Sequence, residues 1–147
     1  NNSDAEVTDA AFNNTTPTSS VFTLSNCASG SCINSNSGTY IAYCWHSVTG
    51  KRKFGSYTGN GSSNHSITGL GFRPDFLLLK NVNSSSTYWS IFDSVRGALG
   101  IYPNATQGES NETGVFVSLD SDGFTVNANN TANQSGHTII YWAEKIH

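Results

Sequence analysis

The sequence of 147 residues contains no methionine and few charges, since only 12% of its residues are Asp, Glu, Lys or Arg. That share is about half of the usual one, and the net charge is −3. Nucleic-acid binding needs a basic face, and a polybasic membrane contact needs clustered lysine and arginine, so the composition argues against both. No apolar run approaches about 18 residues, which argues against a transmembrane helix and membrane insertion.

A signal-peptide pattern is also lacking, and the sequence starts at Asn1. We therefore expect the chain to be processed, or to be a piece of a longer polypeptide. Its polarity comes from serine, threonine, asparagine and glycine, whereas aromatic residues make up 12%. This neutral, aromatic-rich mixture is typical of an all-β protein with many turns and does not fit a disordered chain.

Cysteine is scarce, with three residues in the chain. Cys27 and Cys32 lie in the short loop "NCASGSC", and we expect a disulfide between them. A zinc site would add Cys44 and His46, two residues apart on one face of a strand. Zinc sites usually have two closely spaced ligand pairs, and only one is clear here, so no metal is expected. Cys44 is then predicted to be a small buried apolar residue.

Short runs of β-branched and aromatic residues, separated by Gly, Ser and Asn, predict about nine or ten strands. No segment keeps a helical period of 3.6. The spacing favours an antiparallel β-sandwich or jelly roll. The turn "DSDG" (120–123) predicts a hairpin, with its glycine in the left-handed region. Strands are expected at residues 21–24, 38–48, 51–59, 64–69, 75–81, 87–94, 114–119, 123–127 and 137–145.

The chain partly repeats itself. Phe22-Thr23 matches Phe124-Thr125, and Gly38, Ile41 and Tyr43 match Gly136, Ile139 and Tyr141 at a spacing of 98 residues. Residues 1–49 therefore look like an arm plus the end of one module, and residues 50–147 look like a complete second module. We expect both to form one compact unit. Chance similarity between two hairpins is the alternative.

No motif points to catalysis or to a cofactor. The loop "FGSYTGNGSSN" (54–64) lacks the Gly-Lys-Ser/Thr ending of a phosphate loop, so its glycines are expected to serve a turn. The pattern Gly-x-Ser-x-Gly of a serine hydrolase is absent, and the calcium-loop acids do not follow Asp120 and Asp122. A glycosidase needs two carboxylates, but no spacing selects a pair among Asp75, Asp93, Glu109, Glu112, Asp120, Asp122 and Glu144.

Aromatic residues are the remaining candidate site residues. They are Trp45, Tyr57, Tyr88, Trp89 and Trp142, most of which stand beside Ile, Leu and Val on predicted strands. Core packing or a subunit interface is the simpler interpretation, and a sugar-stacking platform is the alternative.

Several segments together resemble a repeat module of tailed-bacteriophage virion proteins, common in marine phages and usually described as tail-fibre or structural proteins. They are "YIAYCWHSVTGKRKFGSYTGNGSSN", "GFRPDFLLLKN", "WSIFDSVRG", "LDSDGFTV" and "SGHTIIYWAE". The similarity covers nearly all of residues 20–145, and its order and spacing are specific. The link "VTGKRK" and the Cys27/Cys32 loop depart from the family pattern.

The resemblance implies a non-enzymatic protein of the virion surface, extracellular, either a tail-fibre or adhesin module or a capsid decoration protein. Its expected partners are other copies of itself, other virion proteins and a host glycan or receptor. The alternative function is a lectin-like carbohydrate-binding module, an analogy of fold only. The repeated strand further suggests that residues 38–48 dock beside, or replace, an equivalent strand of another module or subunit.

Overall fold

The computed structural model describes residues 15–25 and 34–147. The chain divides into two units, and the boundary at residues 46 and 47 lies close to the module boundary predicted at residue 49. The larger unit contains Ser47–His147, and the smaller one spans Val7–His46. The predicted disulfide between Cys27 and Cys32 lies outside the described residues.

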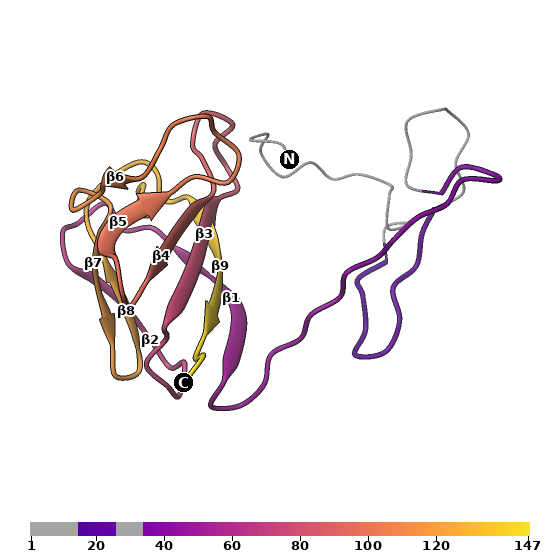
Figure 1. Ribbon diagram of the computed structural model, residues 1–147, viewed down its shortest axis with the longest axis horizontal. Coiled ribbons are helices and arrows are strands. Elements are labelled where there is room, and N and C mark those ends of the chain that lie inside the picture. Colours follow the sequence, from indigo (N-terminus) through magenta and orange to yellow (C-terminus); the bar gives the residue numbers. More distant parts are fainter. Residues whose placement is uncertain (1–14, 26–33) are drawn as a thin grey trace. The chain divides into compact units, whose positions relative to one another are not determined.

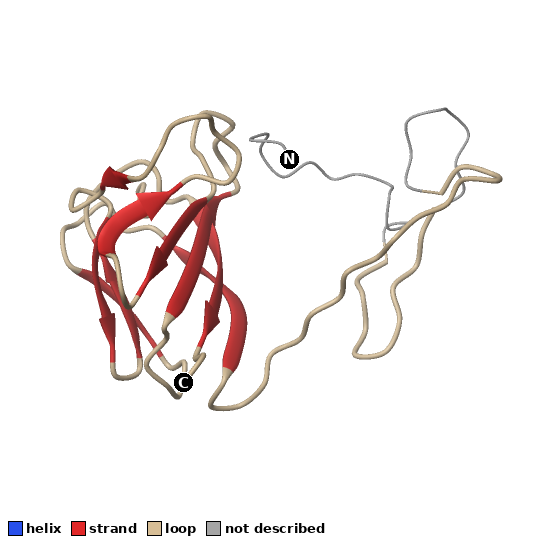
Figure 2. Ribbon diagram, viewed as in Figure 1, coloured by secondary structure: helices blue, strands red, loops and turns tan. Residues whose placement is uncertain are grey.

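The larger unit is an all-β, sandwich-like module, which confirms the predicted fold class (Figures 1 and 2). One antiparallel sheet has six strands in the order β1-β9-β3-β4-β5-β6, and the other has three in the order β2-β8-β7. Among the described residues there is no helix. The strands are β1 (Arg52–Thr58), β2 (His65–Thr68), β3 (Phe76–Asn81), β4 (Ser90–Asp93), β5 (Gly97–Ile101), β6 (Ser110–Asn111), β7 (Phe116–Asp120), β8 (Gly123–Val126) and β9 (Thr138–Glu144).

Strand β9 lies between β1 and β3 and shows why this sequence forms a sandwich. Alternate side chains of a strand point to opposite faces of a sheet. On β9 the alternate residues Ile139, Tyr141 and Ala143 are buried, and their neighbours are half-buried. The inward residues meet those of the second sheet in a single core. Its buried members are Ile67, Leu70, Phe72, Leu77, Leu79, Phe92, Val115, Phe116, Phe124, Val126, Ala132, Ile139, Tyr141 and Ala143.

Seven of the predicted strands are present, with shifted ends. The prediction missed β5 and β6, because "GALGI" and "SN" lack the β-branched and aromatic residues that mark a strand. It was wrong for residues 21–24 and 38–47, whose described residues form no strand. In that region only Val48 is bridged, to Arg52. A segment with the composition of a strand becomes one only when a neighbouring strand pairs with it, and its own composition does not reveal whether such a neighbour is present.

The predicted hairpin at residues 120–123 joins β7 to β8, but the expected conformation of Gly123 was wrong. Gly123 has no positive φ. A side chain here is excluded for another reason: a Cβ atom would overlap the carbonyl oxygen of Ile67 on the neighbouring strand β2. The glycine therefore permits the close approach of two backbones rather than a left-handed turn.

Candidate functional site

The outward face of the six-stranded sheet carries a continuous band of apolar side chains. Phe54 of β1 lies opposite Trp142 of β9, and Trp142 lies opposite Leu78 of β3. Leu78 in turn lies opposite Ile91 of β4, which pairs with Ile101 of β5. Directly paired residues of neighbouring strands share one face of a sheet. These five residues, here named the outer row, therefore cross five strands side by side.

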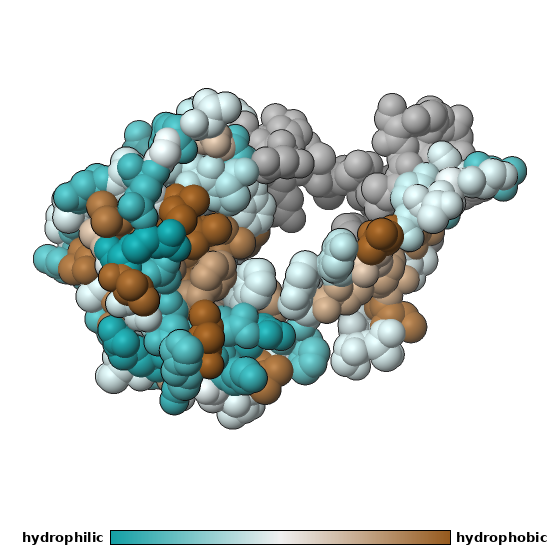
Figure 3. Space-filling model, viewed as in Figure 1, coloured by the Kyte–Doolittle hydropathy of each residue, from teal (hydrophilic) through white to brown (hydrophobic). Residues whose placement is uncertain are grey.

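Two further apolar residues widen the outer row. Phe76 contacts Trp142 edge-on, with ring centroids 5.2 Å apart, and the rings of Phe54 and Trp142 lie 5.5 Å apart. Ile140 follows on the same face of β9. All seven side chains are half-buried. Figure 3 shows that apolar residues gather in patches on the visible face of this unit, with polar residues around them.

Such a face is unusual for a two-layer sandwich. The outward side of an antiparallel sheet is normally polar, because it faces water. A contiguous apolar patch on the surface typically marks a site of contact with another molecule. The outer row is therefore the candidate functional site of the module.

An ion pair borders the outer row. Arg52 of β1 pairs with Glu144 of β9, and the indole Nε1 of Trp142 donates a hydrogen bond to Glu144 Oε2 at 3.2 Å. The hydrogen bond from Arg52 holds the pKa of the Glu144 carboxyl below its ordinary value. The carboxylate thus fixes the orientation of the largest side chain in the row. An apolar patch edged by polar groups is the usual layout of a protein interface.

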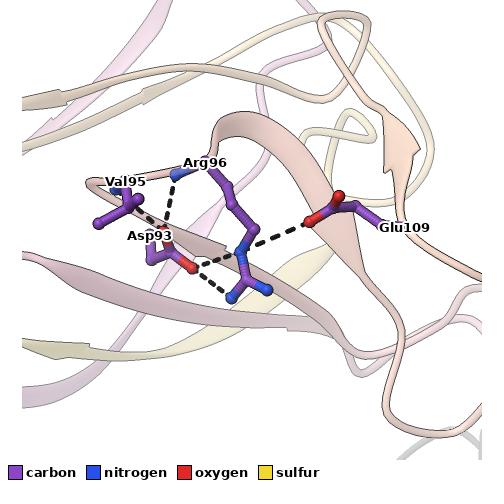
Figure 4. A network of polar contacts seen from close by, with 4 residues as sticks. All are labelled: Asp93, Val95, Arg96 and Glu109. Carbon is purple, nitrogen blue, oxygen red and sulfur yellow. Dashed lines mark hydrogen bonds and ion pairs between the residues drawn. The ribbon is translucent and has the colours of Figure 1, made fainter.

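A shallow depression of about 430 Å³ lies at the end of the sheet where Asp75 and Asp93 are found. Burial alone raises the pKa of Asp93, but hydrogen bonds from Arg96 and Val95 outweigh it and hold that pKa below its ordinary value. Figure 4 shows Arg96 between Asp93 and Glu109, whose oxygen lies 3.6 Å from Arg96 Nε. Backbone hydrogen bonds from Ile146 and His147 likewise lower the pKa of Asp75.

This depression does not have the electrostatics of a glycosidase. Such an enzyme needs one carboxyl with a raised pKa as the general acid. The pKa values of Asp75 and Asp93 are both lowered, and their oxygens accept hydrogen bonds from the chain itself. These contacts stabilise the turn after β4 and the C-terminal residues, which is a structural role.

The predicted aromatic residues are not gathered into one site. Tyr57 packs against the core, with its ring 5.9 Å from that of Phe124, and its hydroxyl donates a hydrogen bond to the Ala132 carbonyl at 2.6 Å. Tyr88 is exposed and stacks edge-on against Tyr102, whereas its neighbour Trp89 is half-buried. Trp45 belongs to the smaller unit, where it is 54% exposed.

The other sequence candidates take structural roles. Asp122 accepts hydrogen bonds from the amides of Gly69 and Gly71, and Asp120 accepts them from the hydroxyls of Ser118 and Thr125. In the part of the chain that the structure describes, no three His, Cys, Asp or Glu side chains gather as metal ligands.

The prediction that Cys44 is buried was wrong, because this free cysteine is exposed. Cys44 lies in the smaller unit, outside the packed core of the larger one, so it does not pack as a small apolar residue.

Sequence reasoning named Trp142 as a candidate aromatic but missed the other residues of the outer row. The signal was present in "DFLLLKN" and "HTIIYWAEK", where apolar residues fill both faces of the strand. A central strand covered on one face by the core leaves the other apolar face for a second contact.

The fold and this face together define an all-β sandwich with an apolar outward surface. A family model matches residues 1–144, and the chain belongs to that family, DUF7483, described as a domain of unknown function. No curated protein and no solved structure matches the chain. In the described ranges there is no helix long and apolar enough to cross a membrane.

Proposed function

We propose that the chain is a non-enzymatic module of a phage particle surface, in a tail fibre, an adhesin or a capsid decoration. It acts through assembly, and the outer row binds neighbouring copies or other virion proteins. The observation that carries the proposal is the continuous apolar band from Phe54 to Ile101 across five strands. The location on a phage rests on the sequence resemblance.

Two features of the module support assembly rather than chemistry. The pKa values of the two carboxyls in the depression, Asp75 and Asp93, are lowered, and both accept hydrogen bonds from the chain's own donors. The two sheets of the sandwich enclose a single core of apolar side chains, which is suited to a structural support. Rigid modules with one apolar face are suited to repeated contacts in a lattice or a fibre.

The carbohydrate-binding alternative has less support. A lectin groove needs at least two exposed aromatic rings facing one ligand. Within residues 47–147, Tyr88 is the one aromatic side chain among the large exposed apolar residues, and its ring packs edge-on against Tyr102. In the smaller unit the exposed rings of Tyr43 and Trp45 stack with their centroids 6.0 Å apart, and this pair is the observation in favour of the alternative.

The experiment combines imaging with substitutions. Antibodies against the chain should label particles in a symmetric pattern. In particles produced with the double variant Leu78→Thr and Ile91→Thr, incorporation should fall at least about tenfold, as expected for the loss of two interface residues. Threonine is β-branched and favours strands, so both strands should still form. Val95→Thr is the matched control, because Val95 is 93% exposed and lies outside the row.

A chain found away from any particle would contradict the proposal. Unchanged incorporation of a folded double variant would remove the role of the outer row. Binding to a glycan array that is lost with Tyr88→Ala would instead favour the carbohydrate-binding alternative.

A further inference from the structure

The smaller unit contains a displaced counterpart of the module's last two strands. Phe22 matches Phe124 of β8, yet Phe22 is 42% exposed and Phe124 has no exposed surface. Ile41 is 78% exposed, whereas Ile140, which the turn described below aligns with it, is half-buried on β9. Residues that pack in the larger unit thus have counterparts in contact with water in the smaller one.

A matching turn precedes both segments. The amide of Gly38 donates to the Ser35 carbonyl at 3.1 Å, and the amide of His137 donates to the Gln134 carbonyl at 3.1 Å. The third residue of each turn has a positive φ, 64° at Ser37 and 77° at Gly136. This similarity of backbone is independent of the sequence match, and it aligns Thr39 with Thr138, the first residue of β9.

The alignment by identical residues and the alignment by the turn differ by one residue. The space available at Ala143 decides between them. A slip of one residue exchanges the two faces of a strand. The alignment by identical residues puts Trp45 at the place of Ala143, which has no exposed surface and lies opposite Leu77. An indole does not fit where a methyl group is enclosed. The alignment by the turn puts Cys44 there, which does fit.

The turn alignment also preserves both faces. Tyr40, Ala42 and Cys44 take the inward places of Ile139, Tyr141 and Ala143, so each set holds one tyrosine and two smaller residues. The outward places of Thr138, Ile140 and Trp142 are taken by residues of the same kinds, namely Thr39, Ile41 and Tyr43. The outward face of the segment therefore continues the apolar character of the outer row.

The order of the inward residues shows that the segment does not fit a module identical to this one. Tyr141 lies opposite Gly55, where any Cβ atom would meet its ring, and Ile139 lies opposite Tyr57. In the turn alignment Tyr40 would face Tyr57, and Ala42 would face Gly55. An identical module would be overpacked at the first position and underpacked at the second.

We propose that Thr39–Trp45 is the last strand of a second, non-identical module of this family, with Val21–Leu24 as the equivalent of its β8. The partner is a β-sandwich that lacks its own last strand and has a small residue where this module has Tyr57. The segment enters between the equivalents of β1 and β3 as a central strand. This assignment goes beyond the proposed function and does not depend on where the chain acts.

The test transfers the segment within the full chain. One variant carries residues 39–45 in place of 138–144, and its control carries residues 40–46 there, which is the alignment by identical residues. All three native cysteines are changed to serine in both. The grafted cysteine then falls at position 143, inside the core, in the first variant, and at position 142, on the outward face, in the control.

The first variant should unfold cooperatively, at least about 10 °C above the control. Its grafted cysteine should react with a thiol reagent at least about tenfold more slowly than that of the control. Tyr57→Ala should lower the Tm of the native chain, and it should raise the Tm of the first variant.

Failure of the first variant to fold, with and without Tyr57→Ala, overturns the proposal. A more stable control, or equal reactivity of the two cysteines, overturns the assigned register. A drop in Tm on Tyr57→Ala in both backgrounds overturns the assignment of a non-identical partner.

Discussion

At the scale of single residues, Gly123 shows how the close approach of two backbones excludes a side chain. At Gly123 a Cβ atom would overlap the Ile67 carbonyl, which is backbone and cannot rotate away. Gly123→Ala should therefore lower the free energy of unfolding by about 2 kcal/mol or more. Gly108→Ala is the matched control, because nothing lies within 4 Å of an added Cβ there, and it should change stability by less than about 0.5 kcal/mol. Urea denaturation measures both, and equal effects would contradict this role of Gly123.

The Asp122 carboxylate makes the free energy of unfolding depend on pH. The amides of Gly71 and Gly69 donate to it and hold its pKa below the ordinary value of 3.8. A lowered pKa in the folded state contributes stability above pH about 4, and this contribution is lost as the pH falls through the folded-state pKa. Asp122→Asn should flatten the loss of stability in acid, as measured by urea denaturation from pH 6 to about pH 2. Ser121→Ala, in the same turn, should keep the slope of the native chain.

At the scale of elements, the loop after β3 is held by a buried ammonium group. Lys80 is 2% exposed, and its Nζ donates to the carbonyls of Ser84 at 2.9 Å and Thr87 at 2.7 Å. Lys80→Met keeps the length of the side chain but leaves both carbonyls without this donor, so stability should fall by about 2 kcal/mol. Amide hydrogen exchange should rise in residues 82–87. Lys145→Met, at an exposed position, should change neither, and protection that survives in the loop of Lys80→Met would contradict the anchoring role.

How far the sequence predicted these elements depends on what each one needs. Alternation and composition were sufficient for β3, β7, β8 and β9, because their side chains report the core directly. The strand β5 owes its existence to pairing with β4 and β6, which its own residues "GALGI" do not encode. The outer row was missed for a similar reason, since it arises from the register of five strands and no single strand displays it. Conversely, residues 38–47 have the composition of a strand and form none in the described structure.

At the scale of the whole molecule, the core residues that the structure describes all belong to the larger unit. Every residue of the core cluster lies between Tyr57 and Ala143, and Ser47 supplies the hydroxyl that accepts from the Phe54 amide at 3.1 Å. A chain that starts at Ser47 should therefore unfold cooperatively with a Tm within about 3 °C of the full chain. It should also be more soluble, because it lacks the exposed side chains of Ile41, Tyr43 and Trp45.

Calorimetry measures the Tm of the two chains, and light scattering against concentration measures their solubility. A fall in Tm of about 10 °C or more would mean that residues before Ser47 stabilise the larger unit, contrary to the division into two units.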